Sequence, residues 1–441
     1  MRIAGMITYS PGKLLSVATI PPTNMIHYIH GGRSMNAVDI GKYLAELRKF
    51  YKVTQEELAV RVGVTRQAVS KWETGTTIPD IEILMALSEI YGISINDILK
   101  ADLSNIKFQK EIVFPEKKKG KKNIFVIGCG RWGTFIAWYL DKIGHDVSLY
   151  GREQSANMQE LLTERKNKYL ALSDTLQLTT SYKGLQKADY IIISVGAQKL
   201  QEVAEDLAEM VTQDKTIVLC MKGIEIETGR RLSQIASDTL AHSNKIAVWL
   251  GPGHVQEFYR GIPNCMVIDS NDELIKDELI RNFSSELIRF YYGTDLIGNE
   301  IGAAAKNVIG IAAGMLEGLD LSSLKGALMA RGTGEVARLI VAMGGKASTV
   351  YGLCHLGDYE ATLFSEHSHN LNFGKNIVQG KSYNQLAEGY YTVKAIRNLG
   401  KSYGVELPIC EAVYQIIHEG KEPRSILKSL FDRSLKNEFM K

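Results

Sequence analysis

Three closely spaced glycines constrain the fold of this chain more than any other feature. Gly128, Gly130 and Gly133 follow a buried strand pattern at Ile124–Ile127 and precede a helical pattern at Phe135–Ile143. In this context the first glycine permits a tight turn, the second lets the backbone approach a pyrophosphate, and the third lets the helix pack on the strand. The amino end of the helix favours phosphate charge. The segment therefore predicts a dinucleotide-binding βαβ unit.

Beyond residue 123, short β-branched runs alternate with helical stretches. Such alternation predicts a Rossmann-like α/β domain over 123–295, built on a parallel, doubly wound sheet. The strand signals stop near 296, and helical patterns rich in Gly and Ala predict an all-α domain over 296–441. The expected strands are Ile124–Ile127, Val147–Tyr150, Tyr190–Val195, Thr216–Cys220, Ile246–Leu250 and Met266–Asp269.

Composition excludes several other classes of protein. The 441 residues are 45% hydrophobic and 23% charged, with a formal net charge of +3. These values argue against a disordered chain, a polycation or a fibrous repeat. No apolar run approaches the ~20 residues that cross a bilayer. Five cysteines without CxxC spacing predict neither a disulfide framework nor a metal site, and they favour the cytoplasm.

Two segments are expected to lie outside the folded domains. Residues 1–34 have no periodic pattern and no long apolar run, so we expect a disordered or untranslated leader rather than a signal peptide. Gly31-Gly32 precedes Met35 closely, and a Gly-Gly pair can be encoded by GGAGG, a ribosome-binding sequence, so translation starting at Met35 is one hypothesis. Residues 102–122 form a polar connector that ends in a run of lysines, which is typical of a solvated linker.

Residues 36–101 predict a small all-α domain. Thr54 and Glu57 have the spacing of a capping box, Gly63 permits a turn, and Thr65 can cap a helix over Arg66–Glu73. The segment "TQEELAVRVGVTRQAVSKWETGTTIPDIEILMALSEIYGISINDIL" resembles the Cro/repressor-like (XRE-type) helix-turn-helix family. The resemblance implies a DNA-binding domain with its recognition helix at 66–72.

The groove-facing candidates of that helix are polar residues suited to reading base edges. Between 39 and 100, eight Lys/Arg stand against nine Asp/Glu, so attraction to phosphate requires the basic residues to cluster. Arg48, Lys49, Lys52, Arg66 and Lys71 could form such a cluster. The alternative is a domain used only for docking or dimerisation. The predicted DNA-contacting residues are Arg66, Gln67, Ser70 and Lys71.

The end of the second strand bears on the choice of cofactor. A site that prefers NAD usually has an acidic residue there, which binds the ribose 2′-hydroxyl. This chain has Gly151-Arg152 instead, and a guanidinium can pair with a 2′-phosphate. NADP(H) is therefore mildly favoured over NAD(H), with Arg152 as a solvated surface residue the alternative.

Later segments concentrate residues that can carry out chemistry. Lys306 lies among Gly, Ala, Val and Ile, where burial without a partner is costly. A desolvated lysine has a lowered pKa and can exchange a proton near neutrality. Read alone, the pattern around Lys306 favours an ordinary amphipathic lysine over a catalytic one. The other such segments are Met221–Glu225, Gly251–His254, and Gly357-Asp358 with Thr362 and Ser368–Asn370.

Seven motifs follow one another between about 123 and 436: "GCGRWGT", "MKGIEIETGR", "GPGHVQE", "EIGAAAKNVIGIAAGM", "HLGDYEAT", "SHNLNFG" and "AEGYYTVKAI". With these motifs the chain resembles the bacterial-type NAD(P)-dependent glycerol-3-phosphate dehydrogenase family. The resemblance implies a Rossmann-like domain and then an all-α domain of the 6-phosphogluconate dehydrogenase C-terminal-like type. It also implies reversible hydride transfer that converts dihydroxyacetone phosphate to sn-glycerol 3-phosphate for phospholipid synthesis.

The resemblance also implies roles for residues. Lys306 matches the general acid/base and Asp358 the carboxylate beside it, with Lys222 and Asn307 completing the catalytic set. Substrate contacts are implied at Lys222, Gly251, Gly253, Lys306, Asp358, Thr362, Ser368, His369 and Asn370. Cofactor contacts are implied at Gly128, Gly130, Arg131, Trp132, Gly133, Arg152, Lys222, Val255, His369 and Glu388.

Two substrate-binding positions depart from the family pattern. His369 stands where the family usually has arginine, and Gly253 stands where it usually has Ser or Thr. An arginine offers phosphate a permanent charge, whereas histidine is mostly neutral at pH 7. Losing such a pair costs on the order of 1.5–3 kcal/mol of binding free energy. His254 could compensate for the loss.

Three functions remain open at this point. The first is an active dehydrogenase fused to a DNA-binding module, expected to be a homodimer. The second is a transcription regulator that senses NAD(P)H or a triose phosphate. The third is a dehydrogenase for a different small 2-oxo or hydroxy substrate. Retention of Lys306, Asp358, Lys222 and Asn307 favours an enzyme, whereas His369 and Gly253 favour the other two.

Overall fold

The computed structural model describes residues 36–50, 53–91, 95–101, 120–210, 214–365 and 368–432. The leader expected at 1–34 lies outside these residues, as does nearly all of the linker expected at 102–122. The chain divides into two compact units, Met1–Lys107 and Phe108–Lys441.

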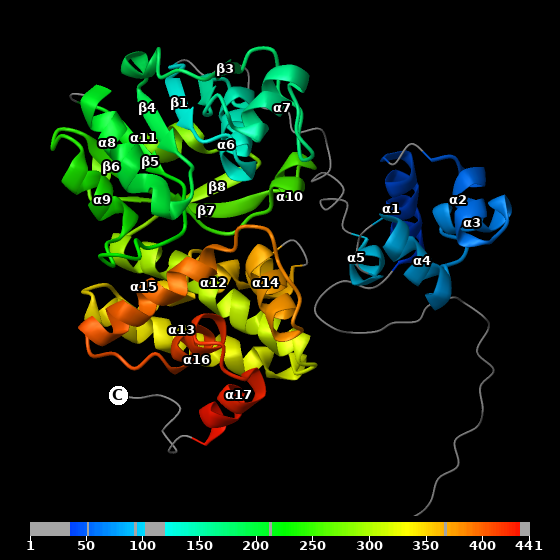
Figure 1. Cartoon of the computed structure of the whole chain (residues 1–441). Coiled ribbons are helices and arrows are strands. Elements are labelled where there is room, and N and C mark those ends of the chain that lie inside the picture. Colours follow the sequence, from blue (N-terminus) through cyan, green and yellow to red (C-terminus); the bar gives the residue numbers. More distant parts are fainter. Residues whose placement is uncertain are drawn as a thin grey trace, which may run out of the picture. The chain divides into compact units, whose positions relative to one another are not determined.

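The described part of the first unit is all helical, as expected (Figure 1). Thr54 and Glu57 form the predicted capping box, and the Thr65 hydroxyl accepts from the Ala68 amide at the start of the third helix. Leu58, Val69 and Leu87 are among the side chains of its hydrophobic core. The helices are α1 Ala37–Phe50, α2 Gln55–Val62, α3 Arg66–Glu73, α4 Ile81–Tyr91 and α5 Ile95–Lys100.

The second unit contains an eight-stranded sheet with the order β3-β2-β1-β4-β5-β6-β7-β8. Strands β1 to β6 run parallel, which places their carboxyl ends at one edge. The strands are β1 Asn123–Ile127, β2 Asp146–Tyr150, β3 Gln177–Thr179, β4 Tyr190–Ile193, β5 Thr216–Leu219, β6 Lys245–Leu250, β7 Asn264–Ser270 and β8 Ile288–Tyr292.

The prediction of a wholly parallel sheet is wrong at its last two strands. Strand β7 runs antiparallel to β6, and β8 runs parallel to β7. The connection from β6 to β7 contains only the five-residue helix α10 (Val255–Tyr259). Such a helix spans about 8 Å, whereas a six-residue strand spans about 20 Å. The chain therefore enters β7 at the same edge of the sheet at which it leaves β6, and β7 runs in the opposite direction.

Strands β3 and β8 were not predicted from the sequence. Strand β3 has three residues, two of them polar, and none of its side chains is fully buried. In β8 only Ile288 and Phe290 are buried, and the intervening Arg289 faces solvent. Both strands lie at the ends of the sheet, where the long apolar runs of central strands are not needed.

Helices cover both faces of the sheet (Figure 1). One hydrophobic core joins the sheet to α6 (Arg131–Lys142), α7 (Ala156–Glu164), α10 and α11 (Glu273–Phe283). The other core joins it to α8 (Leu200–Met210) and α9 (Leu232–Thr239). The arrangement is the doubly wound architecture that the sequence predicts.

The C-terminal part of this unit is a helical layer packed around α12 (Leu296–Gly318), which is buried along most of its length. Glycines let neighbouring helices approach closely; a side chain at Gly314 would collide with the Leu371 carbonyl, and one at Gly374 with the Ile311 carbonyl. The remaining helices are α13 Lys325–Ala342, α14 His369–Val378, α15 Glu388–Ser402, α16 Pro408–His418 and α17 Pro423–Phe431.

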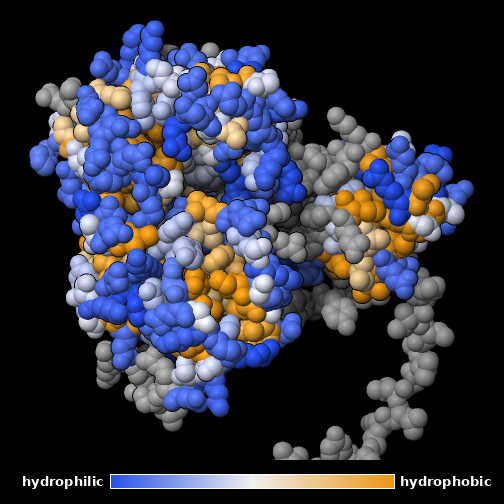
Figure 2. Space-filling view, in the orientation of Figure 1, coloured by the Kyte–Doolittle hydropathy of each residue, from blue (hydrophilic) through white to orange (hydrophobic). Residues whose placement is uncertain are grey.

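The surface of the second unit differs between its two layers. Figure 2 shows a largely hydrophilic α/β layer, whereas hydrophobic residues gather on the visible face of the helical layer. Within the described ranges, no helix combines the length and the apolar character needed to span a bilayer.

Candidate functional site

The glycine-rich turn joins β1 to α6 with the geometry that its sequence predicts. Gly128 has φ +112°, and a side chain there would collide with the Ser194 carbonyl of the neighbouring strand end. A side chain at Gly133 would collide with the Gly128 carbonyl. At Gly130, which caps α6, a Cβ would meet no atom within 4 Å. The turn therefore leaves open space before the amino end of α6, which fits the pyrophosphate of a dinucleotide.

Other predicted cofactor residues surround this turn in different ways. Trp132 packs on Phe135, with ring centroids 5.1 Å apart. Arg152 follows β2 and is exposed, and no carboxylate contacts it among the residues that the structure describes. Val255 is 2% exposed within the hydrophobic core, so only its backbone is available to a cofactor.

Glu388 is the first residue of α15 and faces the carboxyl end of the sheet. A side chain at Gly196 would lie 3.9 Å from Glu388 Oε1, and the Ala197 amide donates to this carboxylate. Burial raises the pKa of Glu388 above its usual value. The helical layer thus contributes a carboxyl group beside the end of β4, where the sequence predicts the cofactor.

Two lysines share one buried carboxylate at the same edge of the sheet. The Lys306 and Lys222 Nζ atoms each lie 2.7 Å from Asp358 Oδ2. Lys222 Nζ also donates to the Gly251 carbonyl at 2.6 Å, and Lys306 Nζ donates to Thr362 Oγ1 at 2.7 Å. Asp358 is 1% exposed. Residues that are far apart in the sequence therefore meet as one charged group.

The environment of Lys306 shifts its protonation toward neutrality. Burial lowers the pKa of Lys306, the Asp358 carboxylate opposes this effect, and the positive charge of Lys222 adds to it, which together bring the pKa to about 8. A lysine of that kind exchanges a proton close to physiological pH. The geometry therefore suits a general acid/base, as the sequence predicts for this residue.

His355 and Tyr359 support this group, and the sequence prediction missed both. His355 is fully buried; one ring nitrogen contacts the Gly302 carbonyl at 2.9 Å and the other the Tyr359 hydroxyl at 2.7 Å. Burial lowers the pKa of His355 to about 4, so the ring is neutral. The bond to Gly302 ties the short helix Leu356–Asp358 to α12 one turn before Lys306, and the bond to Tyr359 holds the ring between the two ends of that short helix. A histidine next to the predicted Asp358 was the available signal.

A series of hydrogen bonds between side-chain amides extends from the lysine group toward the start of α15. Asn307 Nδ2 contacts the Lys222 carbonyl at 3.5 Å, and Asn370 Nδ2 donates to Asn307 Oδ1 at 3.1 Å. Asn370 Oδ1 in turn accepts from the Gly389 amide at 2.9 Å. Ser368 caps α14 by accepting from the Leu371 amide. The amide contacts bring Asn307 of α12 and Asn370 of α14 together with the start of α15.

The two departures from the family pattern have different structural settings. Gly253 has φ +153°, and a side chain there would collide with the Phe258 ring, which stacks on Phe135 at 5.0 Å. A hydroxyl-bearing residue therefore does not fit this position without a shift of the ring. His369 begins α14, and its Nδ1 contacts the Tyr383 hydroxyl at 2.7 Å.

In the first unit, the predicted recognition helix has a polar, accessible face. Arg66, Gln67 and Lys71 are exposed, and Ser70 is half-buried with its carbonyl accepting from the Thr74 hydroxyl. These residues share the outer surface of α3, whereas Val69 and Trp72 face the core. The arrangement suits contact with base edges and phosphates.

The prediction of a basic cluster beside that helix is wrong for Arg48. Arg48 forms two hydrogen bonds with Glu73, at 2.5 and 3.0 Å, and donates to the Val53 carbonyl. This guanidinium ties α1 to α3 and is not available to phosphate. Lys49 pairs with Glu46 on the exposed surface, and Lys52 lies outside the described residues.

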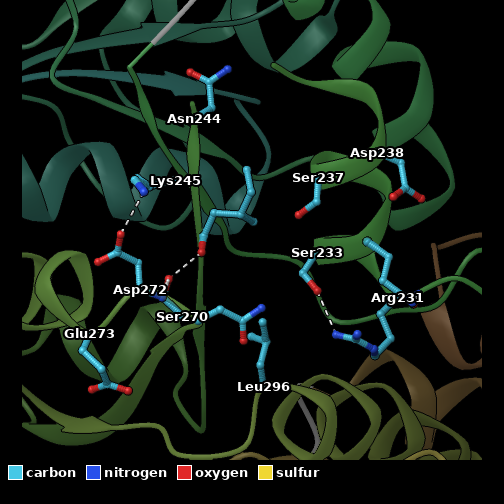
Figure 3. Close-up of a pocket in the computed structure, with 13 residues that line it drawn as sticks. Arg231, Ser233, Ser237, Asp238, Asn244, Lys245, Ser270, Asp272, Glu273 and Leu296 are labelled. Carbon is cyan, nitrogen blue, oxygen red and sulfur yellow. Dashed lines mark hydrogen bonds and ion pairs between the residues drawn. The ribbon is translucent and has the colours of Figure 1, made fainter. Parts of the chain in front are cut away.

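A polar cavity of about 650 Å³ lies at the opposite edge of the sheet, near the amino end of β6. Some of its polar groups pair with one another, and Figure 3 marks the bond between Arg231 and Ser233 among them. Lys245 pairs with Asp272 at 3.1 Å, and the Ser270 hydroxyl donates to the Ile246 carbonyl. None of the residues predicted to bind or react lines this cavity.

Comparison with known proteins matches three parts of the chain to family models. Residues 123–275 match the model described as "NAD-dependent glycerol-3-phosphate dehydrogenase N-terminus", and residues 295–428 match the corresponding C-terminus. Residues 44–98 match a "Helix-turn-helix" model.

Individual relatives agree with these matches. A "Glycerol-3-phosphate dehydrogenase [NAD(P)+]" of Chlorobium limicola is 35% identical over 332 residues, which is 72% of this chain and 99% of the relative. One of Agrobacterium fabrum is 36% identical over 327 residues, or 72% of this chain and 99% of the relative. A crystal structure of glycerol-3-phosphate dehydrogenase from Coxiella burnetii superposes with a TM-score of 0.67 at 28% identity, covering 71% of this chain and 99% of that one.

Proposed function

Because this chain belongs to the family of NAD-dependent glycerol-3-phosphate dehydrogenases, we propose that it reduces dihydroxyacetone phosphate reversibly to sn-glycerol 3-phosphate for glycerophospholipid synthesis. The observation that carries the proposal is the buried Lys306–Asp358–Lys222 group. It lies at the carboxyl edge of a sheet whose first turn fits a dinucleotide, which is where open α/β sheets bind their ligands.

A bound nicotinamide cofactor supplies the hydride for this reaction, and the residues of the chain handle the proton. Lys306, as an ammonium, donates a proton to the C2 oxygen of the ketone while hydride adds to C2, so the carbonyl becomes an alcohol. Asp358 holds the ammonium in place, and Thr362 fixes its direction through the bond to Nζ. In the reverse direction neutral Lys306 accepts the proton.

The surrounding residues bind and orient the substrate in this proposal. Lys222 and Asn307 lie beside the reacting carbon, with Gly251 holding Lys222 through its carbonyl. The phosphate end is received by the remaining predicted substrate residues, Gly253, Ser368, His369 and Asn370.

For the cofactor we propose NADP(H), with NAD(H) as the alternative. The support is Arg152, which is exposed shortly after β2 and forms no ion pair with a carboxylate among the residues that the structure describes, although Glu153 follows it in the chain. Gly128, Gly130, Gly133, Arg131 and Trp132 would hold the pyrophosphate side. Lys222, Val255, His369 and Glu388 would lie toward the nicotinamide side, Val255 through its backbone.

Substitution of Lys306 by alanine tests the catalytic assignment. Turnover is expected to fall by at least a thousandfold, with NADPH binding retained, because the alanine removes the proton donor but not the dinucleotide turn. The control is Lys199→Ala, which removes an exposed lysine of the same unit. Lys276 does not serve as a control, because it is also buried. Turnover retained in Lys306→Ala contradicts the assignment.

The helix-turn-helix unit adds a second function to the proposal. Arg66, Gln67, Ser70 and Lys71 would contact DNA, and a homodimer would present two such helices to a palindromic site. A cytoplasmic protein would meet both its substrates and DNA. A salt-dependent footprint on genomic fragments tests this part, since phosphate contacts weaken with salt.

A regulator that senses NAD(P)H or triose phosphate is the second candidate. The attached helix-turn-helix domain favours it, together with His369 in place of a permanent charge. A dehydrogenase for another small 2-oxo or hydroxy compound remains the third. DNA affinity measured with and without NADPH and dihydroxyacetone phosphate, beside an assay of turnover, separates these functions.

A further inference from the structure

Two cationic side chains of the α/β layer lie together without an acidic partner. The Arg131 guanidinium carbon lies 5.8 Å from the centre of the Tyr169 ring, and Lys168 Nζ lies 4.9 Å from it. In the same loop, Arg165 and Lys166 are paired with Asp174 and Glu164. Within the described ranges, neither Arg131 nor Lys168 has a carboxylate at ion-pair distance.

Both cations lie near enough to His369 for their charges to act on it, and the charge of Arg131 acts likewise on Tyr383. Burial lowers the pKa of His369, and the positive charges of Arg131 and Lys168 lower it further. The other close polar contact of the ring is the Tyr383 hydroxyl, 2.7 Å from Nδ1. His369 is therefore neutral at pH 7 and does not itself supply the charge that an arginine would bring to this position.

We propose that Arg131 and Lys168, together with the His369–Tyr383 pair, form an anion subsite for a phosphoryl group. The α/β layer thus contributes the positive charge that the helical layer lacks at residue 369. The inference rests on the proposed function for its choice of ligand, the phosphate of the substrate. His369 stands between Ser368 and Asn370 in the chain, which the proposed function assigns to the substrate phosphate, and this favours that source. The pyrophosphate of the cofactor is the other source of the same chemistry, because Arg131 begins α6.

The subsite also gives the tyrosine between the cations a function. A cation over an aromatic face is held by the ring quadrupole without being neutralised. Tyr169 therefore keeps Arg131 and Lys168 in place while leaving their charge available to an anion. A carboxylate in the same position would have cancelled that charge.

Lys168→Met is the first variant that tests the subsite, with Lys166→Met as its control in the same loop. The Kd for inorganic phosphate, measured by thermal shift, and the KM for dihydroxyacetone phosphate are each expected to rise about five- to tenfold in Lys168→Met, because an exposed charge-assisted contact is lost. The increases in Kd and KM relative to the wild-type chain should be smaller in 0.5 M salt, which screens an electrostatic contact. Lys166→Met should leave both values unchanged.

The combination with His369→Arg sharpens the test. An arginine at 369 should restore phosphate affinity in the Lys168→Met background and add less in the wild-type chain, where the charge is already present. Equal gains in both backgrounds would mean that the two positions act independently, which contradicts a shared subsite.

Measurements of cofactor binding distinguish the two sources of the phosphoryl group, the substrate phosphate and the cofactor pyrophosphate. Unchanged Kd values for NADH and NADPH in Lys168→Met, beside weaker phosphate binding, support the substrate. Weaker binding of both cofactors with phosphate binding unchanged assigns the cations to the cofactor and overturns the substrate subsite. No change in any of these constants overturns the subsite altogether. Because phosphate and cofactor binding need no turnover, a chain that fails to reduce dihydroxyacetone phosphate would contradict the proposed function without deciding this inference.

Discussion

The two units of this chain place their polar side chains in opposite ways. In the dehydrogenase unit, Lys306 and Asp358 are buried and bonded to one another, and the helices around them fix their positions. In the helix-turn-helix unit, Arg66, Gln67 and Lys71 stand exposed on one face of α3. The first arrangement suits proton transfer to a small molecule that enters the site. The second suits a large, charged partner that approaches from outside.

The burial of a polar residue also determines how much its substitution changes the free energy of unfolding. Breaking a buried ion pair leaves an uncompensated charge and costs about 3–5 kcal/mol, whereas most surface substitutions change stability by less than about 0.5 kcal/mol. Changes in the dehydrogenase site should therefore disturb folding and function together. Changes on α3 should disturb function alone.

The largest effect is expected from Asp358→Ala. Removal of this carboxylate leaves Lys306 buried without its counter-charge, so the free energy of unfolding should fall by about 3–5 kcal/mol and turnover should be lost. Urea unfolding and a steady-state assay measure the two quantities. Asp277→Ala, which removes an exposed partner of Arg281, serves as the control. Full stability in Asp358→Ala would show that the buried group is not held by this pair.

A smaller loss of stability is expected from Gly253→Ser. The added side chain meets the Phe258 ring, and overpacking of this kind costs about 1–3 kcal/mol. Although serine is usual at this position in the family, the substitution should not improve the KM for dihydroxyacetone phosphate. A second change, Phe258→Leu, should recover part of the lost stability. A lower KM with unchanged melting temperature would contradict the packing explanation.

The pH dependence of the rate should follow Lys306. Since the pKa of Lys306 is lowered to about 8, its protonated form decreases as pH rises through that value. Reduction of dihydroxyacetone phosphate should therefore fall about tenfold per pH unit above 8, while oxidation of glycerol 3-phosphate should rise toward a plateau. Profiles of kcat/KM in both directions between pH 6 and 10 measure this. Parallel profiles in the two directions would argue against a single acid/base.

The smallest effect on turnover is expected from the double variant Gln67→Ala, Lys71→Ala. Each base contact contributes about 1–3 kcal/mol to DNA recognition, so the footprint should weaken or disappear while kcat stays within experimental error. Lys100→Ala changes an exposed lysine at the end of α5, outside the predicted DNA-contacting residues and the basic cluster, and it should leave the footprint intact. Loss of turnover in the double variant would mean that the two units depend on one another.

Much of the fold could be predicted because local signals agreed with the tertiary structure. The capping residues Thr54 and Thr65, the glycine turn after β1 and the six apolar strands each specify their element locally. The direction of β7 could not be predicted, because it depends on the length of a connection rather than on the strand sequence. The end strands β3 and β8 were missed because few of their side chains are buried.

The candidate site was predictable as a set of residues but not as a group in space. Lys222, Lys306 and Asp358 each stood in a recognisable motif, and the structure places them around one oxygen atom. The support from His355 and Tyr359 was missed because it depends on contacts with α12 across the fold. Arg48 was assigned to a basic cluster because its partner, Glu73, is distant in sequence.

Oxidation of NADPH by the purified chain with dihydroxyacetone phosphate, with NADH in parallel, is the most direct test. We expect clear turnover with both the full-length chain and the Lys199→Ala control, faster with NADPH, and none with Lys306→Ala. Binding of either cofactor without turnover by the wild-type chain would contradict the proposed reaction and would favour a sensor or another substrate.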